Sequence, residues 1–248
     1  MKKRTCIFVD GENFRHSIVD LFDKFDRNDY LPKEADWGAF FDDLVKKVLG
    51  DDGERIRTYW YVVESLDSYP YTFSQLRKDP ETLKSIILKN KPDLRKLDDS
   101  DQQDRIEQIS QNVGNNLDKI RRRFDGWMEI QNGISIRHAA IEFRRSGAIR
   151  YNAFDDSLGP EKGVDVKLAT DLIVLKDIYD VAIIVSGDQD YVPAVQVVKD
   201  FGKRVVNVAF QTRSGKLLPG GARRLNLVAD HGLEVTHDSF SKFLNVGK

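Results

Sequence analysis

Oxygen-bearing side chains follow two short apolar segments of the chain. One group comes directly after residues 5–9 and a second directly after residues 181–185, while a further aspartate lies near the start of the apolar stretch 164–178. Carboxylates brought within ~4 to 6 Å of one another raise each other's pKa unless a cation compensates for their charge. If these side chains converge, they predict a metal site. The set comprises Asp10, Asn13, Asp165, Ser186, Asp188 and Asp190.

The ligand types in this set favour a hard divalent cation. Every member offers oxygen, Cys6 is the only cysteine, and the four histidines show no ligand spacing. Oxygen donors of this kind suit Mg²⁺ or Mn²⁺ rather than zinc. Such ions can generate a hydroxide nucleophile and neutralise the leaving oxygen at phosphorus, so the set predicts phosphate chemistry.

Each aspartate taken alone also has a simpler interpretation. Asp165 could serve only to stabilise a helix amino terminus through the macrodipole. Asp10 and Gly11 could be no more than a turn, because aspartate and glycine are common turn residues. The metal hypothesis therefore depends on the residues acting together.

The elements that must position these side chains alternate between strand and helix. Residues 5–9, 56–63, 181–185 and 205–210 are apolar and β-branched, as in buried strands. Apolar residues at three- and four-residue spacing predict helices over 14–25, 37–48, 164–178 and 192–198. This alternation predicts a mostly parallel sheet with helices on both faces. The carboxyl ends of parallel strands then meet at one edge, where Asp10 and Asp188 would lie together.

The region from about 64 to 133 interrupts this alternation and is interpreted as an insertion. It contains three prolines, an acidic stretch, and a helix over 106–124. That helix has enough apolar surface to pack within the subunit or against a second chain. The sequence is therefore compatible with a homodimer. Beyond it, Arg144–Gly147 is interpreted as the turn of a β-hairpin.

Three segments of the sequence together resemble the signature blocks of a known family. Residues 7–14 (IFVDGENF), 162–166 (KGVDV) and 186–193 (SGDQDYVP) are similar to those of NYN-domain proteins, which are PIN-like ribonuclease relatives that include the bacterial LabA-like group. The resemblance covers residues 1 to about 63 and about 134 to 230. It implies a PIN-like three-layer α/β/α sandwich with a mostly parallel central sheet and a helical insertion.

The resemblance also implies a function and a site. The implied activity is metal-dependent endonucleolytic cleavage of RNA, with metal ligation by Asp10, Asp165 and Asp188, Asp190 as a fourth acid, and Asn13 as a supporting polar group. Asp171 also matches a family aspartate. It lies six residues beyond Asp165 and therefore points about 240° round the helix from it, so a structural role competes with a role in metal ligation. We expect one domain over 1–230, with the insertion at about 64–133, and a C-terminal extension over 231–248.

Basic residues are concentrated in two stretches, although the formal net charge is only −1. Residues 119–150 hold eight basic and three acidic side chains, and residues 199–224 hold seven and one. Such clusters bind phosphate backbones, although a solvated surface charge run is the simpler interpretation of either. We expect Lys162, Ser186, Arg213 and Lys216 to contact the substrate. Unpaired bases could stack on Tyr151, Phe154 and Tyr191.

Two other functions compete with a ribonuclease. A non-catalytic RNA-binding or regulatory module would keep the fold and the basic surface. A metal-dependent phosphatase would use Asp10 as its nucleophile, but Gly11, Glu12 and Asn13 do not continue the pattern DxDx[TV] of one such class. The apolar run at residues 6–9 is too short for a signal peptide or a membrane span, so we expect a cytoplasmic protein that has no membrane partner.

Overall fold

The computed structural model describes residues 1–26, 29–219 and 222–244, which divide into two units. Unit 1 comprises Met1–Val62, Met128–Ser146 and Gly163–Lys248, and unit 2 comprises Val63–Trp127 and Gly147–Lys162. No helix in the described part of the chain combines the length and the apolar composition that a membrane span requires.

The sheet of unit 1 is mostly parallel. Strand β1 (Lys3–Asp10) pairs in parallel with β2 (Gly53–Tyr69) on one side and with β5 (Val181–Val185) on the other. Strand β6 (Arg204–Gln211) continues the parallel set beside β5. It also pairs in parallel with β8 (His231–Thr236) and, near its end, antiparallel with the short β7 (Leu217–Leu218).

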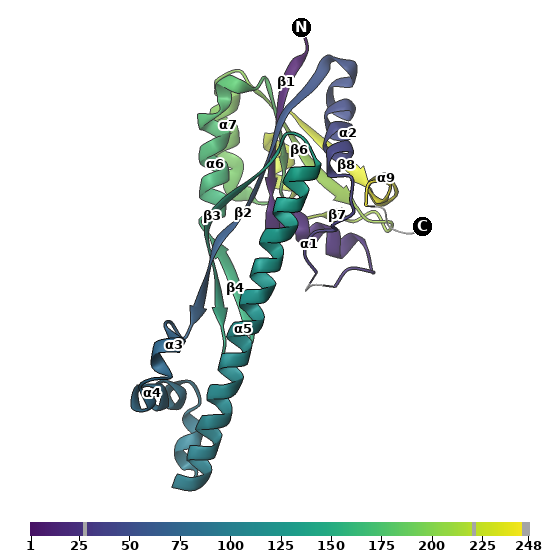
Figure 1. Cartoon of the computed structure of the whole chain (residues 1–248). Coiled ribbons are helices and arrows are strands. Elements are labelled where there is room, and N and C mark those ends of the chain that lie inside the picture. Colours follow the sequence, from purple (N-terminus) through teal and green to yellow (C-terminus); the bar gives the residue numbers. More distant parts are fainter. Residues whose placement is uncertain (27–28, 220–221, 245–248) are drawn as a thin grey trace. The chain divides into compact units, whose positions relative to one another are not determined.

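Helices cover both faces of this sheet because alternate residues of the buried strands point to opposite sides. Ile7 and Val9 belong to an aromatic-rich core with Phe14 and Trp37, whereas the Phe8 ring packs edge-on against Tyr179, 5.6 Å away. Figure 1 shows α6 and α7 on one side of the sheet and α1 and α2 on the other. The mixed α/β fold with a mostly parallel, helix-flanked sheet is confirmed. The helices of this unit are α1 (Gly11–Leu21), α2 (Trp37–Leu49), η1 (Gly50–Asp52), α6 (Val164–Val174), η3 (Lys176–Ile178), η4 (Gln189–Tyr191), α7 (Val192–Asp200), α8 (Ala222–Val228) and α9 (His237–Ser241).

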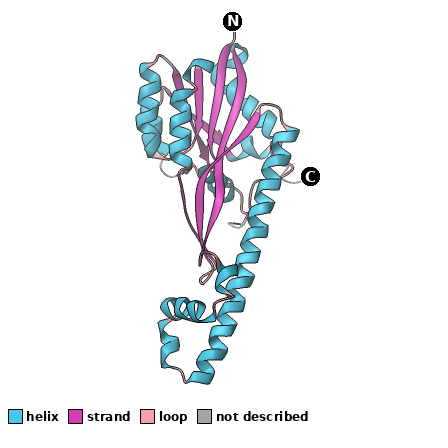
Figure 2. Cartoon of the chain, turned by 60° about the vertical axis from the view of Figure 1, so that its left-hand side comes forward, coloured by secondary structure: helices cyan, strands magenta, loops and turns pink. Residues whose placement is uncertain are grey.

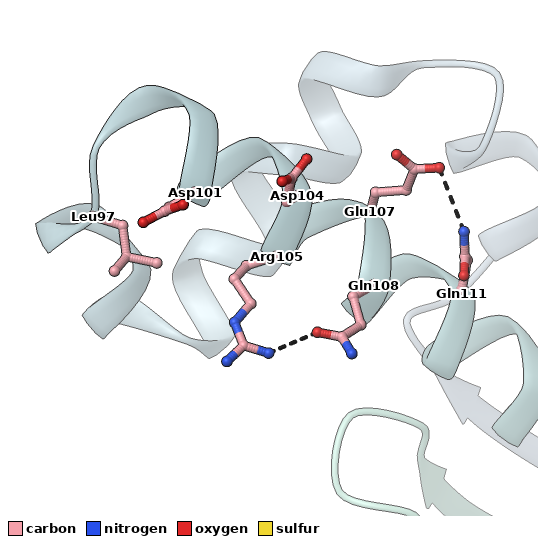
Figure 3. A pocket seen from close by; sticks show the side chains of 7 residues that line it. All are labelled: Leu97, Asp101, Asp104, Arg105, Glu107, Gln108 and Gln111. Carbon is pink, nitrogen blue, oxygen red and sulfur yellow. Dashed lines mark hydrogen bonds between the residues drawn. The ribbon is translucent and has the colours of Figure 1, made fainter.

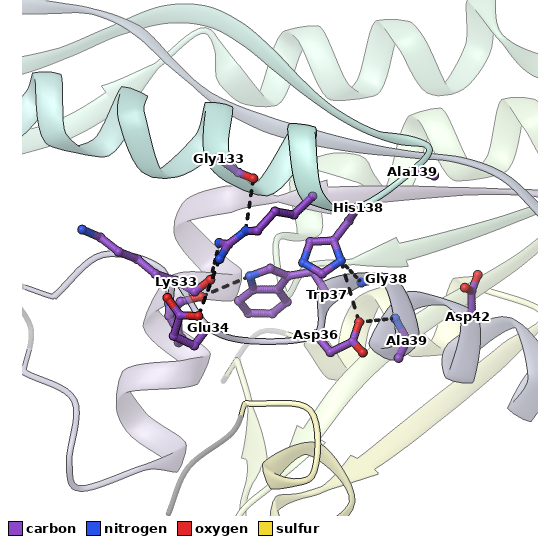
Figure 4. Close-up of polar contacts among 12 residues, drawn as sticks. Lys33, Glu34, Asp36, Trp37, Gly38, Ala39, Asp42, Gly133, His138 and Ala139 are labelled. Carbon is purple, nitrogen blue, oxygen red and sulfur yellow. Dashed lines mark hydrogen bonds and ion pairs between the residues drawn. The ribbon is translucent and has the colours of Figure 1, made fainter.

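The long helix α5 (Asp99–Arg137) contributes residues to both units, and its last turns are anchored within unit 1. Just after the helix, His138 Nδ1 accepts a hydrogen bond from the Gly38 backbone N–H at 3.3 Å, in the first turn of α2 (Figure 4). Asp36, the N-cap of α2, accepts from the Ala39 N–H at 2.9 Å in the same group. The start of α2 and the end of α5 are thereby held together by polar contacts.

Unit 2 has an apolar core of its own. It is built from α3 (Phe73–Leu76), α4 (Pro80–Asn90), η2 (Pro92–Lys96), the first part of α5, the part of β3 (Ile141–Asn152) that begins at Gly147, and β4 (Ser157–Lys162). The buried core residues are Phe73, Leu83, Ile87, Ile106, Val113, Leu117, Ile120, Tyr151 and Ala153. In Figure 2, β3 and β4 are drawn as strands and α4 and α5 as helices.

A surface hollow on unit 2 carries both signs of charge. Its lining side chains bond to one another: Arg105 Nη1 donates to Gln108 Oε1 at 2.7 Å, and Gln111 Nε2 donates to Glu107 Oε1 at 3.4 Å (Figure 3). These two hydrogen bonds join residues of the same helix, α5, and the hollow is also lined by Leu97, Asp101 and Asp104.

The predicted hairpin turn at Arg144–Gly147 is wrong. Strand β3 runs straight through these residues, and the turn to β4 comes at residues 153–156. There Asn152 forms a local cap: its Oδ1 accepts from the Phe154 N–H at 3.1 Å, and its Nδ2 donates to Asp155 Oδ2 at 2.7 Å. Side-chain bonds of this kind define an Asx turn, which outweighed the glycine signal.

Residues 231–244 of the predicted C-terminal extension carry β8 and α9. Strand β8 pairs with β6 from Val206 to Gln211, and Phe240 of α9 is buried in the unit 1 core. Residues 245–248 of the predicted extension lie outside the described residues.

Candidate acidic site at the carboxyl edge of the sheet

Asp10 and Ser186 lie side by side because their strands are adjacent and in register. Val9 of β1 pairs with Val185 of β5, so the residues that follow them share one edge of the sheet. Ser186 Oγ donates to Asp10 Oδ2 at 2.8 Å. The structure thus brings together two groups that are 176 residues apart in the chain.

Asp10 is almost completely buried, with 2% of its surface exposed, and is the N-cap of α1. Its Oδ1 accepts from the Asn13 backbone N–H at 3.1 Å, and its Oδ2 accepts from Asn13 Nδ2 at 2.7 Å. Burial raises the pKa of Asp10 to about 6, and the negative charge of Asp165 acts in the same direction, against the hydrogen bonds from Asn13, Ser186 and Tyr191. The site therefore concentrates negative charge that the neighbouring donors do not fully compensate.

Tyr191 connects Asp10 to Asp165. Its hydroxyl lies 3.1 Å from Asp10 Oδ2 and 3.0 Å from Asp165 Oδ1, and the residue is fully buried. Burial raises the pKa of the Asp165 carboxyl, and the negative charges of Asp188 and Asp190 raise it further, against the hydrogen bond from Tyr191. The expectation that Tyr191 could stack on a base is wrong, because its ring is enclosed by protein.

Asp188 and Asp190 occupy the turn that follows β5. The Asp188 backbone N–H donates to Ser186 Oγ at 3.0 Å, and Asp188 Oδ1 accepts from the Asp190 N–H at 2.9 Å as the N-cap of η4. Asp188 is half-buried and Asp190 is exposed. Their charges act on Asp165, so all four aspartates belong to one electrostatic neighbourhood.

The NYN domain family model matches residues 4–219 of the sequence, and these residues carry the whole acidic arrangement. The chain belongs to the NYN-domain family. NYN domains form part of the PIN-like superfamily of nuclease-type domains. No curated protein matches the sequence. A crystal structure of a protein of unknown function from Vibrio parahaemolyticus is similar, with 14% identity and a TM-score of 0.44, over 94% of this chain and 93% of its own.

The acidic site of this NYN domain has the donor chemistry of a hard-cation site. Carboxylate, amide and hydroxyl oxygens are the ligands that Mg²⁺ and Mn²⁺ prefer. Burial raises the pKa values of Asp10 and Asp165, and the negative charges of neighbouring aspartates raise them further. As the side chains stand, no three His, Cys, Asp or Glu residues within residues 1–26, 29–219 and 222–244 are grouped to hold an ion. The residues fit such a cation by type, and their side chains would have to draw together around it.

Two acids near the motifs of the NYN domain are neutralised by other partners. Glu12 lies next to the site in sequence, but Arg15 donates to it at 2.6 and 2.8 Å; despite burial, the hydrogen bonds from Arg15 and His16 lower the pKa of Glu12 to about 2. Asp171 is buried, with 4% exposed, and accepts from Tyr61 Oη at 3.1 Å and Lys167 Nζ at 2.9 Å, and from Arg144 Nη1. Both therefore have structural partners outside the acidic site.

The predicted substrate contacts lie on different elements. Arg213 and Lys216 are exposed on the hairpin between β6 and β7, where Arg213 Nε lies 3.7 Å from Asp238 Oδ1. Lys162 is the exposed last residue of β4, in unit 2. Tyr151, another predicted base-stacking residue, is instead buried in the unit 2 core, where its hydroxyl donates to Asp156 Oδ1 at 2.6 Å.

Sequence reasoning missed Arg224 as a neighbour of the acidic turn. Its Nη1 donates to Gln189 Oε1 at 2.6 Å, and Gln189 stands between Asp188 and Asp190. In the sequence, Arg224 is one of the seven basic residues of the stretch 199–224, and nothing there distinguishes it from the other six. No sequence signal pairs it with Gln189, which lies 35 residues earlier.

Proposed function

We propose that this NYN domain is a divalent-metal-dependent endoribonuclease that hydrolyses RNA phosphodiester bonds at the acidic site. The observation that carries the proposal is the linked set of Asp10, Asp165 and Tyr191, drawn from three elements to one edge of the sheet. Burial raises the pKa values of Asp10 and Asp165, and repulsion from the neighbouring aspartates adds to the rise. A cation bound among these carboxylates would offset that repulsion.

In this proposal, Asp10, Asp165 and Asp188 hold Mg²⁺ or Mn²⁺, and each residue around them has a defined task. The bound ion supplies Lewis-acid activation and charge neutralisation at the scissile phosphate. Asn13 and Ser186 orient the Asp10 carboxylate through their hydrogen bonds to Oδ2. The exposed carboxylate of Asp190 accepts a proton from the attacking water.

RNA binding in this proposal comes from the basic side chains of Arg213, Lys216 and Lys162. The hairpin that carries Arg213 and Lys216 follows the carboxyl end of β6, which runs parallel to β5. Lys162 directly precedes Gly163, the N-cap of α6, and is three residues before Asp165. Lysine and arginine at such positions bind backbone phosphates without reading sequence.

The test is cleavage of a defined RNA by the purified protein in Mn²⁺. We expect Asp10→Asn and Asp188→Asn each to lower cleavage at least ~100-fold, because the ion contributes several kcal/mol of transition-state stabilisation. Asp51→Asn, at an exposed aspartate of η1, is the matched control and should keep full cleavage. Circular dichroism and thermal melting show whether the variants keep their fold. Equal cleavage by the wild type and both site variants would reject the proposal and point to a contaminating nuclease.

A non-catalytic RNA-binding module is the second candidate. It is favoured by the lack of any three grouped ligands in the described part of the chain. Such a module would bind RNA with a steep salt dependence and release no product at any Mn²⁺ concentration. A phosphatase that uses Asp10 as its nucleophile is disfavoured, because both Asp10 oxygens already accept hydrogen bonds and the residue is buried.

A further inference from the structure

We propose that Arg224, held in place by Gln189, is the residue that binds an RNA backbone phosphate immediately beside the acidic turn. The inference rests on the proposed function and names a specific contact for its substrate. Neither residue is among the predicted substrate contacts Lys162, Ser186, Arg213 and Lys216.

The first observation is the partner that Arg224 has. Its guanidinium donates to the neutral amide oxygen of Gln189 at 2.6 Å, although Asp188 and Asp190 flank that glutamine. Across residues 1–26, 29–219 and 222–244, no carboxylate forms an ion pair with Arg224. An amide acceptor positions the guanidinium but does not cancel its charge, as a carboxylate would.

The second observation is that the short helix α8 is firmly anchored, which fixes the backbone that carries Arg224. Leu225 is fully buried, and Asn226 Oδ1 accepts from Nδ2 of the buried Asn207 on β6 at 2.7 Å. Lys199 Nζ of α7 donates to the Val228 carbonyl oxygen at 2.7 Å, at the end of the helix. An exposed arginine on an anchored backbone, with one donor already held, loses less conformational entropy on binding.

The chemistry of the guanidinium identifies the ligand. Arginine offers five N–H donors in a planar fork, and the bond to Gln189 uses only one of its nitrogens. The remaining donors match two oxygens of a phosphate. Since the flanking aspartates belong to the acidic site, the phosphate that reaches Arg224 is one adjacent to the bond to be cut.

The experiment measures binding of a single-stranded RNA in EDTA, by fluorescence anisotropy, over a range of KCl concentrations. The slope of log K against log salt is negative, and each lost phosphate contact reduces its magnitude by ~0.7 for a single strand. Arg224→Gln should show this smaller slope and an affinity about 5- to 10-fold lower at 0.1 M KCl. Arg224→Lys should restore the slope but only part of the affinity, because the charge returns without the fork.

Gln189→Ala tests the positioning role. We expect the wild-type slope with a modest loss of affinity, and no further loss when Gln189→Ala is added to Arg224→Gln, because the two residues act as one unit. Lys46→Gln, at an exposed lysine of α2, is the charge-matched control and should leave both affinity and slope unchanged.

A wild-type slope for Arg224→Gln, or an equal loss in Lys46→Gln, would overturn the inference. Either result leaves the proposed function standing, because wild-type binding and cleavage are measured separately. Wild-type protein that binds no RNA would overturn the inference and the proposed function together. Cleavage assays separate the acidic site from the Arg224 contact. Loss of cleavage in Asp188→Asn with normal RNA binding would concern the acidic site alone.

Discussion

At Asp10, three side chains converge on a single carboxylate oxygen. Asn13 Nδ2, Ser186 Oγ and Tyr191 Oη lie 2.7, 2.8 and 3.1 Å from Oδ2. This arrangement holds the carboxylate in one orientation while burial still raises its pKa to about 6. Orientation and uncompensated charge are the two properties that a cation ligand needs.

The stability of the metal-free protein should depend on the ionisation of Asp10. Because the folded-state pKa lies near 6, above the ordinary value of about 3.9, this group's contribution is fully present below pH ~4 and is lost as pH rises through 6. Asp10→Asn removes that dependence. In EDTA, the free energy of unfolding of the variant relative to wild type should therefore rise between pH 4 and pH 7.5, by up to about 3 kcal/mol, as measured by denaturant unfolding at each pH. A difference that stays constant with pH would contradict this.

Tyr191→Phe should weaken metal binding while it keeps the ring in the core. The change removes the hydroxyl that Asp10 and Asp165 share, and losing such an orienting bond lowers metal affinity about 10-fold or more. Calorimetric titration with Mn²⁺ measures the effect. The control is Tyr179→Phe, at a buried tyrosine whose hydroxyl donates to the Leu172 carbonyl and contacts no aspartate of the site. Unchanged Mn²⁺ affinity in Tyr191→Phe would show that the hydroxyl does not position the acids.

At the scale of elements, helix α6 carries two aspartates with different environments. Asp165 in the first turn contacts Tyr191, whereas Asp171 is held by Tyr61, Arg144 and Lys167. Six residues separate them, which turns the second about 240° from the first. Hydrogen bonds from Lys167 and Arg144 lower the pKa of Asp171 against the effect of burial. One side of α6 is thereby fixed to the sheet, while another side presents Asp165.

The junction of β1 and α1 should tolerate only glycine at position 11. A Cβ atom there would lie 2.4 Å from the Tyr61 carbonyl oxygen and 2.9 Å from Val62 Cγ1. Since the first of these is backbone, Gly11→Ala must displace β1 or β2, and we expect a loss of about 1–3 kcal/mol in free energy of unfolding together with weaker Mn²⁺ binding.

The matched control for that change is Gly133→Ala in α5. Its Cβ would meet no atom within 4 Å, so the substitution should stabilise the helix by about 0.5–1 kcal/mol and leave Mn²⁺ binding unchanged. Denaturant unfolding measures both variants. If Gly11→Ala were as stable as Gly133→Ala, close packing of β1 against β2 would not explain the glycine.

At the scale of the whole molecule, the two units have separate cores and should respond separately to core substitutions. Leu117 is buried in unit 2, and Leu117→Ala should lower stability by about 2–5 kcal/mol. Hydrogen exchange should then accelerate in unit 2, with Mn²⁺ binding in unit 1 unaffected. Leu168→Ala, at a fully buried residue of α6, should accelerate exchange in unit 1 and weaken Mn²⁺ binding. Equal acceleration in both units by Leu117→Ala would show that they unfold as one.

The sequence by itself determined the parallel centre of the sheet and the strand ends that carry Asp10 and Ser186. Apolar runs such as residues 5–9 and 181–185 read as buried strands from local composition, and strand–helix alternation implies parallel pairing. Parallel pairing then carries Asp10 and Ser186 to the same edge whatever the details of packing. These properties depend on residues close together in the chain, which is why the sequence reveals them.

Only the tertiary structure decided which side chains meet at that edge. An aromatic residue in an acidic turn could stack on a base, but packing encloses Tyr191 and turns its hydroxyl toward Asp10 and Asp165. The contact between Gln189 and Arg224 likewise depends on where α8 docks. Contacts between residues tens of positions apart arise from the packing of whole elements, and periodicity within each element does not encode them.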